Sequence, residues 1–252
     1  MYNLVDLTNK HIVITGASSG IGKAIALLCD KLGANISLIG RNINNLNLVL
    51  DLMKGANNYA YEFDVCDMSS MDKLIDDIVI KSGPIDGFVH SAGIEMTRPI
   101  KMLKIKNYSD VFNTNTISAL ELTKFITKSG NVSANASVVY ISSIVGILGQ
   151  AGKTAYSASK AALIGASKCL ALELAPRGIR VNTILPAVVE TNMSKNVLDS
   201  LSEENKNNIL KMHPLGFGKP EDIANSAAFL LSTASNWITG VEFIVDGGYS
   251  AS

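Results

Sequence analysis

Cysteine, histidine and any excess of charge are scarce in this sequence. The 252 residues include three cysteines, Cys29, Cys66 and Cys169, an odd and scattered set that predicts reduced thiols rather than a disulfide framework. The three histidines show no ligand spacing, so we expect no metal site. Lys plus Arg equal Asp plus Glu at 22 each, and this balance gives no reason to expect binding to nucleic acid or an acidic membrane surface.

Long apolar runs and a leader-like segment are also missing. The first ten residues, MYNLVDLTNK, are polar and lack the apolar centre of a signal peptide. No uninterrupted apolar run approaches the length of about 20 residues that crosses a bilayer. We therefore expect a soluble, cytoplasmic protein that binds neither membrane nor nucleic acid.

A tyrosine and a lysine four residues apart are the most informative feature that is present. On a helix, Tyr156 and Lys160 would lie on one face within reach of each other, and Ser143 precedes them at the end of the apolar run SVVYIS. A free tyrosine has a pKa near ~10, and a neighbouring ammonium lowers it. A serine hydroxyl at the same point could hold a substrate oxygen, so the pattern favours acid/base chemistry at a C–O centre. The same spacing also arises by chance as an ordinary amphipathic pair, and the surrounding motifs have to decide.

A glycine cluster follows the first expected strand. The β-branched run HIVIT at 11–15 leads into GASSGIG and then into the helical pattern KAIALLCDKLGA. Gly16, Gly20 and Gly22 would let the backbone approach a diphosphate, whose charge the N–H groups of the next helix would stabilise. The cluster predicts a dinucleotide site.

The rest of the chain alternates expected strands with expected helices. Strands are predicted at 11–15, 35–40, 58–65, 85–90, 137–141, 179–185 and 241–247. Six or seven helices lie between and after them, including a long one over 104–128 and one that carries Tyr156 and Lys160 as far as 175. The pattern predicts one α/β domain over 1–252, a doubly wound Rossmann-type parallel sheet with helices on both faces. A polar stretch at about 187–212 is expected to form a substrate flap.

These motifs together resemble the short-chain dehydrogenase/reductase family over essentially the whole chain. They are TGASSGIG at 15–22, SAG at 91–93, Asn115, Ser143, Tyr156-x-x-x-Lys160, Pro186 to Thr191 and the C-terminal ITGVEFIVDGG. The resemblance implies an NAD(P)(H)-dependent oxidoreductase that interconverts a ketone and a secondary alcohol. It implies Tyr156 as general acid or base, Ser143 as a hydrogen-bonding partner of the substrate carbonyl, and Lys160 as the group that lowers the tyrosine pKa and binds the nicotinamide ribose. Asn115 would hold a water of a proton relay.

The resemblance also implies a set of cofactor contacts. They comprise Gly16, Ser18, Ser19 and Ile21 at the diphosphate, Asp64 and Val65 at the adenine, Ser91 and Gly93 after the fourth strand, Pro186, Val189 and Thr191 at the carboxamide, and Tyr156 and Lys160. NADP(H) is expected to be preferred, with NAD(H) still possible, because Gly40 replaces the usual acidic residue and Arg41 can pair with a 2′-phosphate. Ser19, where many NADP users carry a basic residue, argues the other way. His90, in place of the more common asparagine, is expected to pack at the strand end.

Three questions concern substrate and partners. The pattern is most similar to 3-oxoacyl (β-ketoacyl) reductases, but sugar, polyol and steroid dehydrogenases share it, and a non-catalytic dinucleotide-binding regulator is the alternative class. Acyl carrier protein is a doubtful partner, because Leu172 stands where the reductases carry an arginine and no Lys or Arg lies between Lys128 and Lys153. A homo-oligomer, tetramer or dimer, is expected because small residues on the tyrosine-bearing helix would allow close helix packing. These residues are Ala161, Ala162, Gly165 and Ala166.

Overall fold

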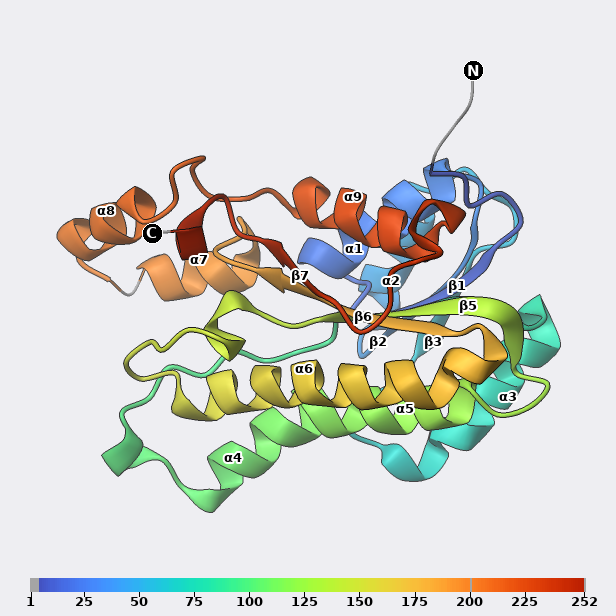
Figure 1. Cartoon of the computed structure of the whole chain (residues 1–252), viewed down its shortest axis with the longest axis horizontal. Coiled ribbons are helices and arrows are strands. Elements are labelled where there is room, and N and C mark those ends of the chain that lie inside the picture. Colours follow the sequence, from blue (N-terminus) through green and yellow to red (C-terminus); the bar gives the residue numbers. More distant parts are fainter. Residues whose placement is uncertain (1–4, 200, 252) are drawn as a thin grey trace.

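Seven parallel strands form one twisted sheet at the centre of the molecule. A computed structural model describes residues 5–199 and 201–251, and the strands lie in the order β3-β2-β1-β4-β5-β6-β7 (Figure 1). Their bounds are β1 His11–Thr15, β2 Asn35–Gly40, β3 Tyr59–Glu62, β4 Ile85–His90, β5 Val132–Ile141, β6 Arg180–Pro186 and β7 Glu242–Val245. The order reverses between β1 and β4, which is where ligands bind in open sheets of this kind.

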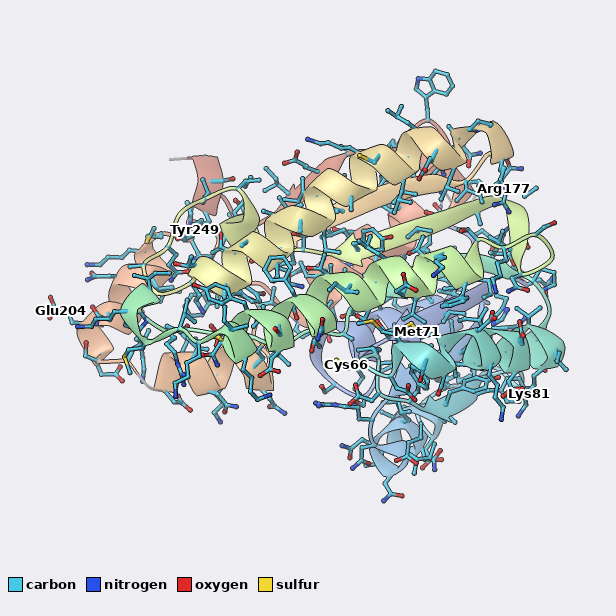
Figure 2. All side chains as sticks on the ribbon, turned by 90° about the horizontal axis from the view of Figure 1, so that it is seen from below. Cys66, Met71, Lys81, Arg177, Glu204 and Tyr249 are labelled. Atoms are coloured by element: carbon cyan, nitrogen blue, oxygen red, sulfur yellow. The ribbon has the colours of Figure 1, made fainter. Side chains whose placement is uncertain are left out.

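Helices cover both faces of the sheet, so the doubly wound α/β prediction is confirmed. The helices are α1 Gly20–Lys31, α2 Ile43–Leu50, α3 Met71–Ser82, α4 Ile105–Phe112, α5 Ser118–Ile126, α6 Thr154–Leu174, α7 Asn192–Asp199, α8 Glu203–Lys211 and α9 Pro220–Leu231. In Figure 1, α1 and α9 lie above the sheet and α5 and α6 below it. Seen from below, α3, α5 and α6 cross in front of the strands (Figure 2).

The strands carry the core because they bury apolar side chains on both faces of the sheet. Strands β1 and β6 are buried at every position, as expected for strands that lie between two helical layers. One apolar cluster joins the sheet to α1, α2 and α9, and a second joins it to α3, α5 and α6. Two apolar layers therefore hold the carboxyl ends of the strands in one fixed row.

The long helix expected over 104–128 is not continuous. Between α4 and α5, residues Asn113–Ile117 form a π-helical turn that contains Asn115. Such turns insert one extra residue per turn and are frequent at functional sites. Strand β5 begins earlier than expected, at Val132, and β3 ends earlier, at Glu62.

The polar stretch after β6 forms two short helices, α7 and α8, at one end of the molecule (Figure 1). Ser202 caps α8, since its hydroxyl accepts a hydrogen bond from the Asn205 N–H at 3.3 Å. No α-helix among the described residues is both long and apolar enough to cross a membrane.

Candidate active site

A cavity of about 990 Å³ opens at the carboxyl ends of the strands. Every cofactor contact expected from the sequence lines it, namely Gly16, Ser18, Ser19, Ile21, Arg41, Asp64, Val65, Ser91, Gly93, Tyr156, Lys160, Pro186, Val189 and Thr191. Ser143 lines the cavity as well, whereas Asn115 does not. The fold thus brings together residues that are up to 175 positions apart in the sequence, as the parallel topology requires.

Tyr156 and Lys160 lie in the first two turns of α6, and Ser143 follows β5. The Lys160 ammonium lies 5.8 Å from the centre of the Tyr156 ring and donates a hydrogen bond of 2.7 Å to the Ile141 carbonyl. The Ser143 hydroxyl lies 3.5 Å from the Pro186 carbonyl and also interacts with the Tyr156 hydroxyl. Three polar side chains therefore meet at one point of the cavity wall.

Burial sets the pKa values of this group. Burial raises the pKa of Tyr156 to about 12, and its hydrogen bond with Ser143 only partly offsets this. Burial lowers the pKa of Lys160 to about 8. Desolvation of the phenol, and secondarily the charge of Glu95, therefore acts against the lowering of the tyrosine pKa that the sequence suggested. At neutral pH the phenol carries its proton.

Asn115 lies behind the cavity wall rather than in it. Its Oδ1 accepts from the Ile94 N–H at 2.8 Å, and its Nδ2 donates to the Ile94 carbonyl and the Ser159 hydroxyl, both at 3.0 Å. A Cβ added at Gly93 would lie 3.2 Å from Asn115 Oδ1, a tight contact, and 3.5 Å from Lys160 Nζ, an ordinary one. The Asn115 side chain thus fixes the loop after β4.

The glycine turn has the shape that a diphosphate needs. Gly16 has φ +64°, and a Cβ there would come within 2.8 Å of the Ala92 nitrogen. A Cβ at Gly22 would come within 2.4 Å of the Gly16 carbonyl oxygen. Ser19, the N-cap of α1, makes no side-chain cap, so the first N–H groups of this helix remain available to an anion in the cavity. The residues present therefore fit the diphosphate of a dinucleotide.

The other end of the dinucleotide site lies beyond β2 and β3. Arg41 is exposed at the cavity wall and takes part in no ion pair among residues 5–199 and 201–251. Asp64 accepts the Cys66 N–H at 2.9 Å through Oδ1. The wall here combines the exposed Arg41 guanidinium with the Asp64 carboxylate. Position 40 is a glycine and therefore adds no negative charge.

His90 supports the site from behind. It is fully buried, and its Nδ1 lies 3.1 Å from the Thr15 hydroxyl, which accepts the Ser91 and Ala92 N–H groups at 3.2 Å. Burial, and secondarily the charge of Lys160, lowers the pKa of His90 to about 3, so the ring is neutral. This agrees with the predicted packing role at the strand end.

The sequence suggested that substrate specificity lies in residues 94–98, 147–152 and the flap around 188–201, but it singled out none of the following cavity residues. Lys153 and Glu95 form an ion pair beside Tyr156, and His213 holds the loop after β6 by accepting the Val188 N–H at 3.3 Å. Tyr249, labelled in Figure 2, packs on His213 with ring centres 4.8 Å apart. Glu95 and Lys153 could have been indicated by their closeness in the sequence to Gly93 and Tyr156. No comparable signal in the sequence indicated His213 or Tyr249. No group of three or more His, Cys, Asp or Glu side chains placed to hold a metal ion occurs in the described part of the chain.

Known proteins share this arrangement along the whole chain. The sequence family described as enoyl-(acyl carrier protein) reductase matches residues 16–250. The 3-oxoacyl-[acyl-carrier-protein] reductase FabG of Rickettsia felis is 36% identical over 246 residues, which cover 97% of this chain and 98% of the relative.

Solved structures give the same result. A dehydrogenase/reductase from Sinorhizobium meliloti 1021 superposes with a TM-score of 0.90 at 28% identity, covering 98% of this chain and 97% of the other. Ligand-free aldohexose dehydrogenase of Thermoplasma acidophilum superposes with a TM-score of 0.86 at 28% identity, covering 98% of this chain and 96% of the other.

The seven-stranded parallel sheet and these relatives identify the chain as an NAD(P)-dependent oxidoreductase. The chain belongs to the short-chain dehydrogenase/reductase family, whose related members are named as reductases and dehydrogenases acting on C=O and CH–OH groups.

Proposed function

We propose that this protein interconverts a ketone and a secondary alcohol with Tyr156 as the proton donor or acceptor. The observation that carries the proposal is that Ser143, Tyr156 and Lys160 meet in the same cavity as the glycine turn. A bound nicotinamide would supply or accept the hydride. Ser143 would donate a hydrogen bond to the carbonyl oxygen, and Tyr156, protonated at neutral pH, would transfer its proton to that oxygen as charge develops.

Lys160 has two tasks in this proposal. Its buried ammonium would bind the ribose hydroxyls of the cofactor, and its charge would stabilise the phenolate that remains after proton transfer. In the oxidation direction the phenol must lose its proton first, so we expect oxidation to be favoured at high pH. Asn115 would hold the relay water through its main chain, since its side chain is already bonded to Ile94 and Ser159.

NADP(H) is the proposed preferred cofactor. Arg41 is an exposed guanidinium at the cavity wall, and its planar fork suits a 2′-phosphate. Gly40 beside it brings no negative charge that would repel this phosphate. The remaining contacts proposed for the cofactor are those of the glycine turn, the adenine end and the loop after β6 described above.

The substrate is proposed to be free rather than attached to a carrier. Leu172, at the position where related carrier-dependent reductases are expected to place an arginine, is 80% exposed and apolar. An acidic carrier would gain no attraction there. A single cytoplasmic domain over residues 1–252, working as a homo-oligomer with 187–212 as its flap, completes the proposal.

The test is the substitution Tyr156→Phe, which removes only the phenol oxygen. NADPH-dependent reduction across a panel of ketones is expected to fall by about 10²–10⁴-fold, while NADPH affinity stays within about threefold of wild type. Tyr59→Phe, on the edge strand β3, is the matched control and should retain full activity. Retention of more than a tenth of the activity by Tyr156→Phe would exclude the role. Tight NADPH binding by wild type with no turnover of any carbonyl would instead indicate the non-catalytic regulator.

A further inference from the structure

The cavity contains a largely buried ion pair that the proposed reaction does not use. Lys153 and Glu95 are in direct contact, with side chains that are only 9% and 19% exposed. The Lys153 ammonium also lies 5.7 Å from the centre of the Tyr156 ring. Both residues line the cavity, so the pair lies beside the phenol that would protonate the substrate.

Two connected loops fix the position of this pair. Glu95 belongs to the loop after β4, and Lys153 is the N-cap residue of α6. The Arg98 N–H donates to the Gly152 carbonyl at 2.7 Å, and the Thr97 hydroxyl donates to Glu95 Oε1 at 2.6 Å. Gly152 has φ +81°, which a residue with a side chain rarely adopts. The pair is therefore held in place before any ligand arrives.

Stability is a poor explanation for such a pair. Desolvation of two buried charges offsets most of their attraction, and replacing both by apolar groups of similar volume is often neutral or stabilising. Two charges beside a reactive phenol are better explained by what they can bind. Resting on the proposed function, we propose that Lys153 and Glu95 recognise a hydroxyl group near the reacting carbon of a neutral substrate, such as a polyol or hydroxyketone.

The hydrogen-bonding capacity of the pair selects this class. An ammonium has three N–H donors, and a carboxylate only accepts. A hydroxyl group can accept from Lys153 and donate to Glu95 at the same time, so both charges keep a partner when water leaves. A substrate carboxylate would face the negative charge of Glu95, and an unsubstituted acyl chain would displace water without replacing its hydrogen bonds.

The experiment compares three probes of one carbon skeleton. Oxidation of cyclohexanol, trans-1,2-cyclohexanediol and trans-2-hydroxycyclohexanecarboxylate is followed by formation of the reduced cofactor, using whichever of NADP⁺ and NAD⁺ the enzyme prefers. The wild-type kcat/KM is expected to be at least tenfold higher for the diol than for cyclohexanol, and no higher for the carboxylate than for cyclohexanol. A site built to bond a hydroxyl discriminates in this way against an analogue that lacks it.

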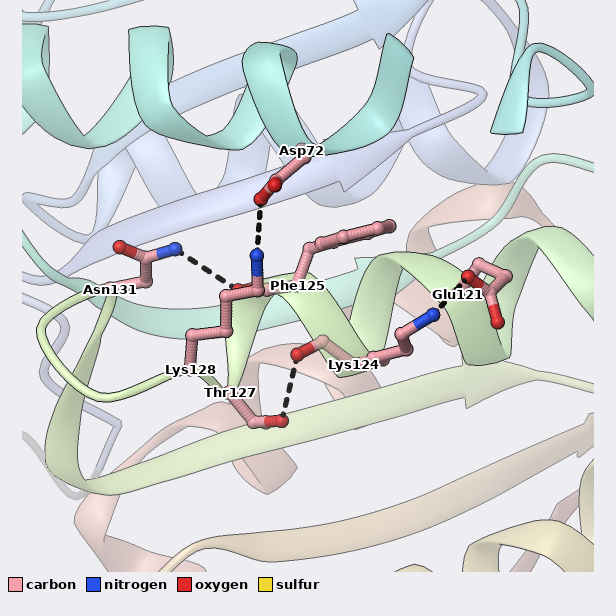
Figure 3. Close-up of polar contacts among 7 residues, drawn as sticks. All are labelled: Asp72, Glu121, Lys124, Phe125, Thr127, Lys128 and Asn131. Atoms are coloured by element: carbon pink, nitrogen blue, oxygen red, sulfur yellow. Dashed lines mark hydrogen bonds and ion pairs between the residues drawn. The ribbon is translucent and has the colours of Figure 1, made fainter. Parts of the chain in front are cut away.

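The variant removes both charges together, because removing one would leave the other buried without a partner. In Glu95→Gln/Lys153→Met, the ratio of kcat/KM for diol to that for cyclohexanol is expected to fall below about threefold. Asp72→Asn/Lys128→Met is the matched control, since Lys128 Nζ lies 2.5 Å from Asp72 Oδ1 and neither residue lines the cavity (Figure 3). This control should keep the wild-type ratio.

Equal kcat/KM for diol and cyclohexanol, a preference for the carboxylate, or an unchanged ratio in the Glu95/Lys153 variant would each overturn the inference. Absence of turnover with every probe would count against the proposed function instead. In that case, binding of the diol to NADP⁺-loaded protein is measured by calorimetry to decide whether the Glu95–Lys153 pair recognises it. Diol binding that is lost in the Glu95/Lys153 variant supports recognition by the pair, and absent or unchanged diol binding overturns it.

Discussion

Lys160 provides the sharpest test of the site, because its buried amine should make the protein less stable. The side chain is buried, and burial lowers its pKa from 10.5 to about 8. A change of this size corresponds to about 3 kcal/mol against the charged form, since each pKa unit is worth about 1.4 kcal/mol. Lys160→Met removes the charge and keeps the length of the side chain, so the variant should be more stable than wild type at neutral pH by up to about 3 kcal/mol.

The pH dependence identifies the amine as the cause. Below pH 8 the amine is protonated in both the folded and the unfolded chain, and the folded state bears the full desolvation cost. Between pH 8 and 10.5 the unfolded chain still holds a proton that the folded protein has released, so the stability of wild type rises with pH across this window. The advantage of Lys160→Met should therefore shrink by about 2 kcal/mol between pH 7 and pH 10.

The assay is urea unfolding of both proteins at equal concentration, at pH 7, 8, 9 and 10. Lys124→Met is the control, because Lys124 is 61% exposed and pairs with Glu121 at 2.8 Å on the surface of α5 (Figure 3). Its free energy of unfolding should stay within about 0.5 kcal/mol of wild type at every pH. A difference between Lys160→Met and wild type that does not change with pH would refute the reasoning.

Three further substitutions test the cofactor site and the assembly. Gly22→Ala should raise the Kd for NADPH more than tenfold and destabilise the fold by up to about 2 kcal/mol in urea, because the new Cβ would lie 2.4 Å from the Gly16 carbonyl oxygen; unchanged NADPH titration would show that the turn can relax. Arg41→Ala should raise the KM for NADPH far more than that for NADH, and equal effects in steady-state kinetics would remove the argument for NADP. Gly165→Arg, on an exposed position of α6, should lower the mass measured by light scattering if this face joins subunits; a wild-type monomer would end the expectation of an oligomer.

The architecture was predictable from the sequence because buried parallel strands leave a clear pattern. Each strand contains β-branched or aromatic residues, and all seven were placed with errors only at their ends. The error at β5 has a physical cause. Its first residues, Val132 to Asn135, are half-buried or exposed and pair with β4 only through an irregular register, so they lack the apolar pattern of a buried strand.

The cofactor wall was predictable for the same reason. Parallel strands bring their carboxyl ends to one edge, so motifs that follow strands must meet there, and all the expected contacts line one cavity. What the pattern could not give is the environment of each side chain. Spacing placed Lys160 near Tyr156, but it could not show that the ammonium is bonded to the Ile141 carbonyl and that burial raises the phenol pKa.

The segments of the substrate side could be located from the sequence, but their contacts could not, because these loops follow no strand or helix pattern. Glu95 and Lys153 lie 58 positions apart in two loops, and only the folded chain shows that they form a pair beside Tyr156. Family motifs specify the chemistry common to all members, whereas loops specify what each member binds. In this protein the phenol of Tyr156 lies near the Lys160 ammonium, which belongs to the common chemistry, and near the opposite charges of Lys153 and Glu95, which do not. We therefore assign substrate choice to the Lys153–Glu95 pair.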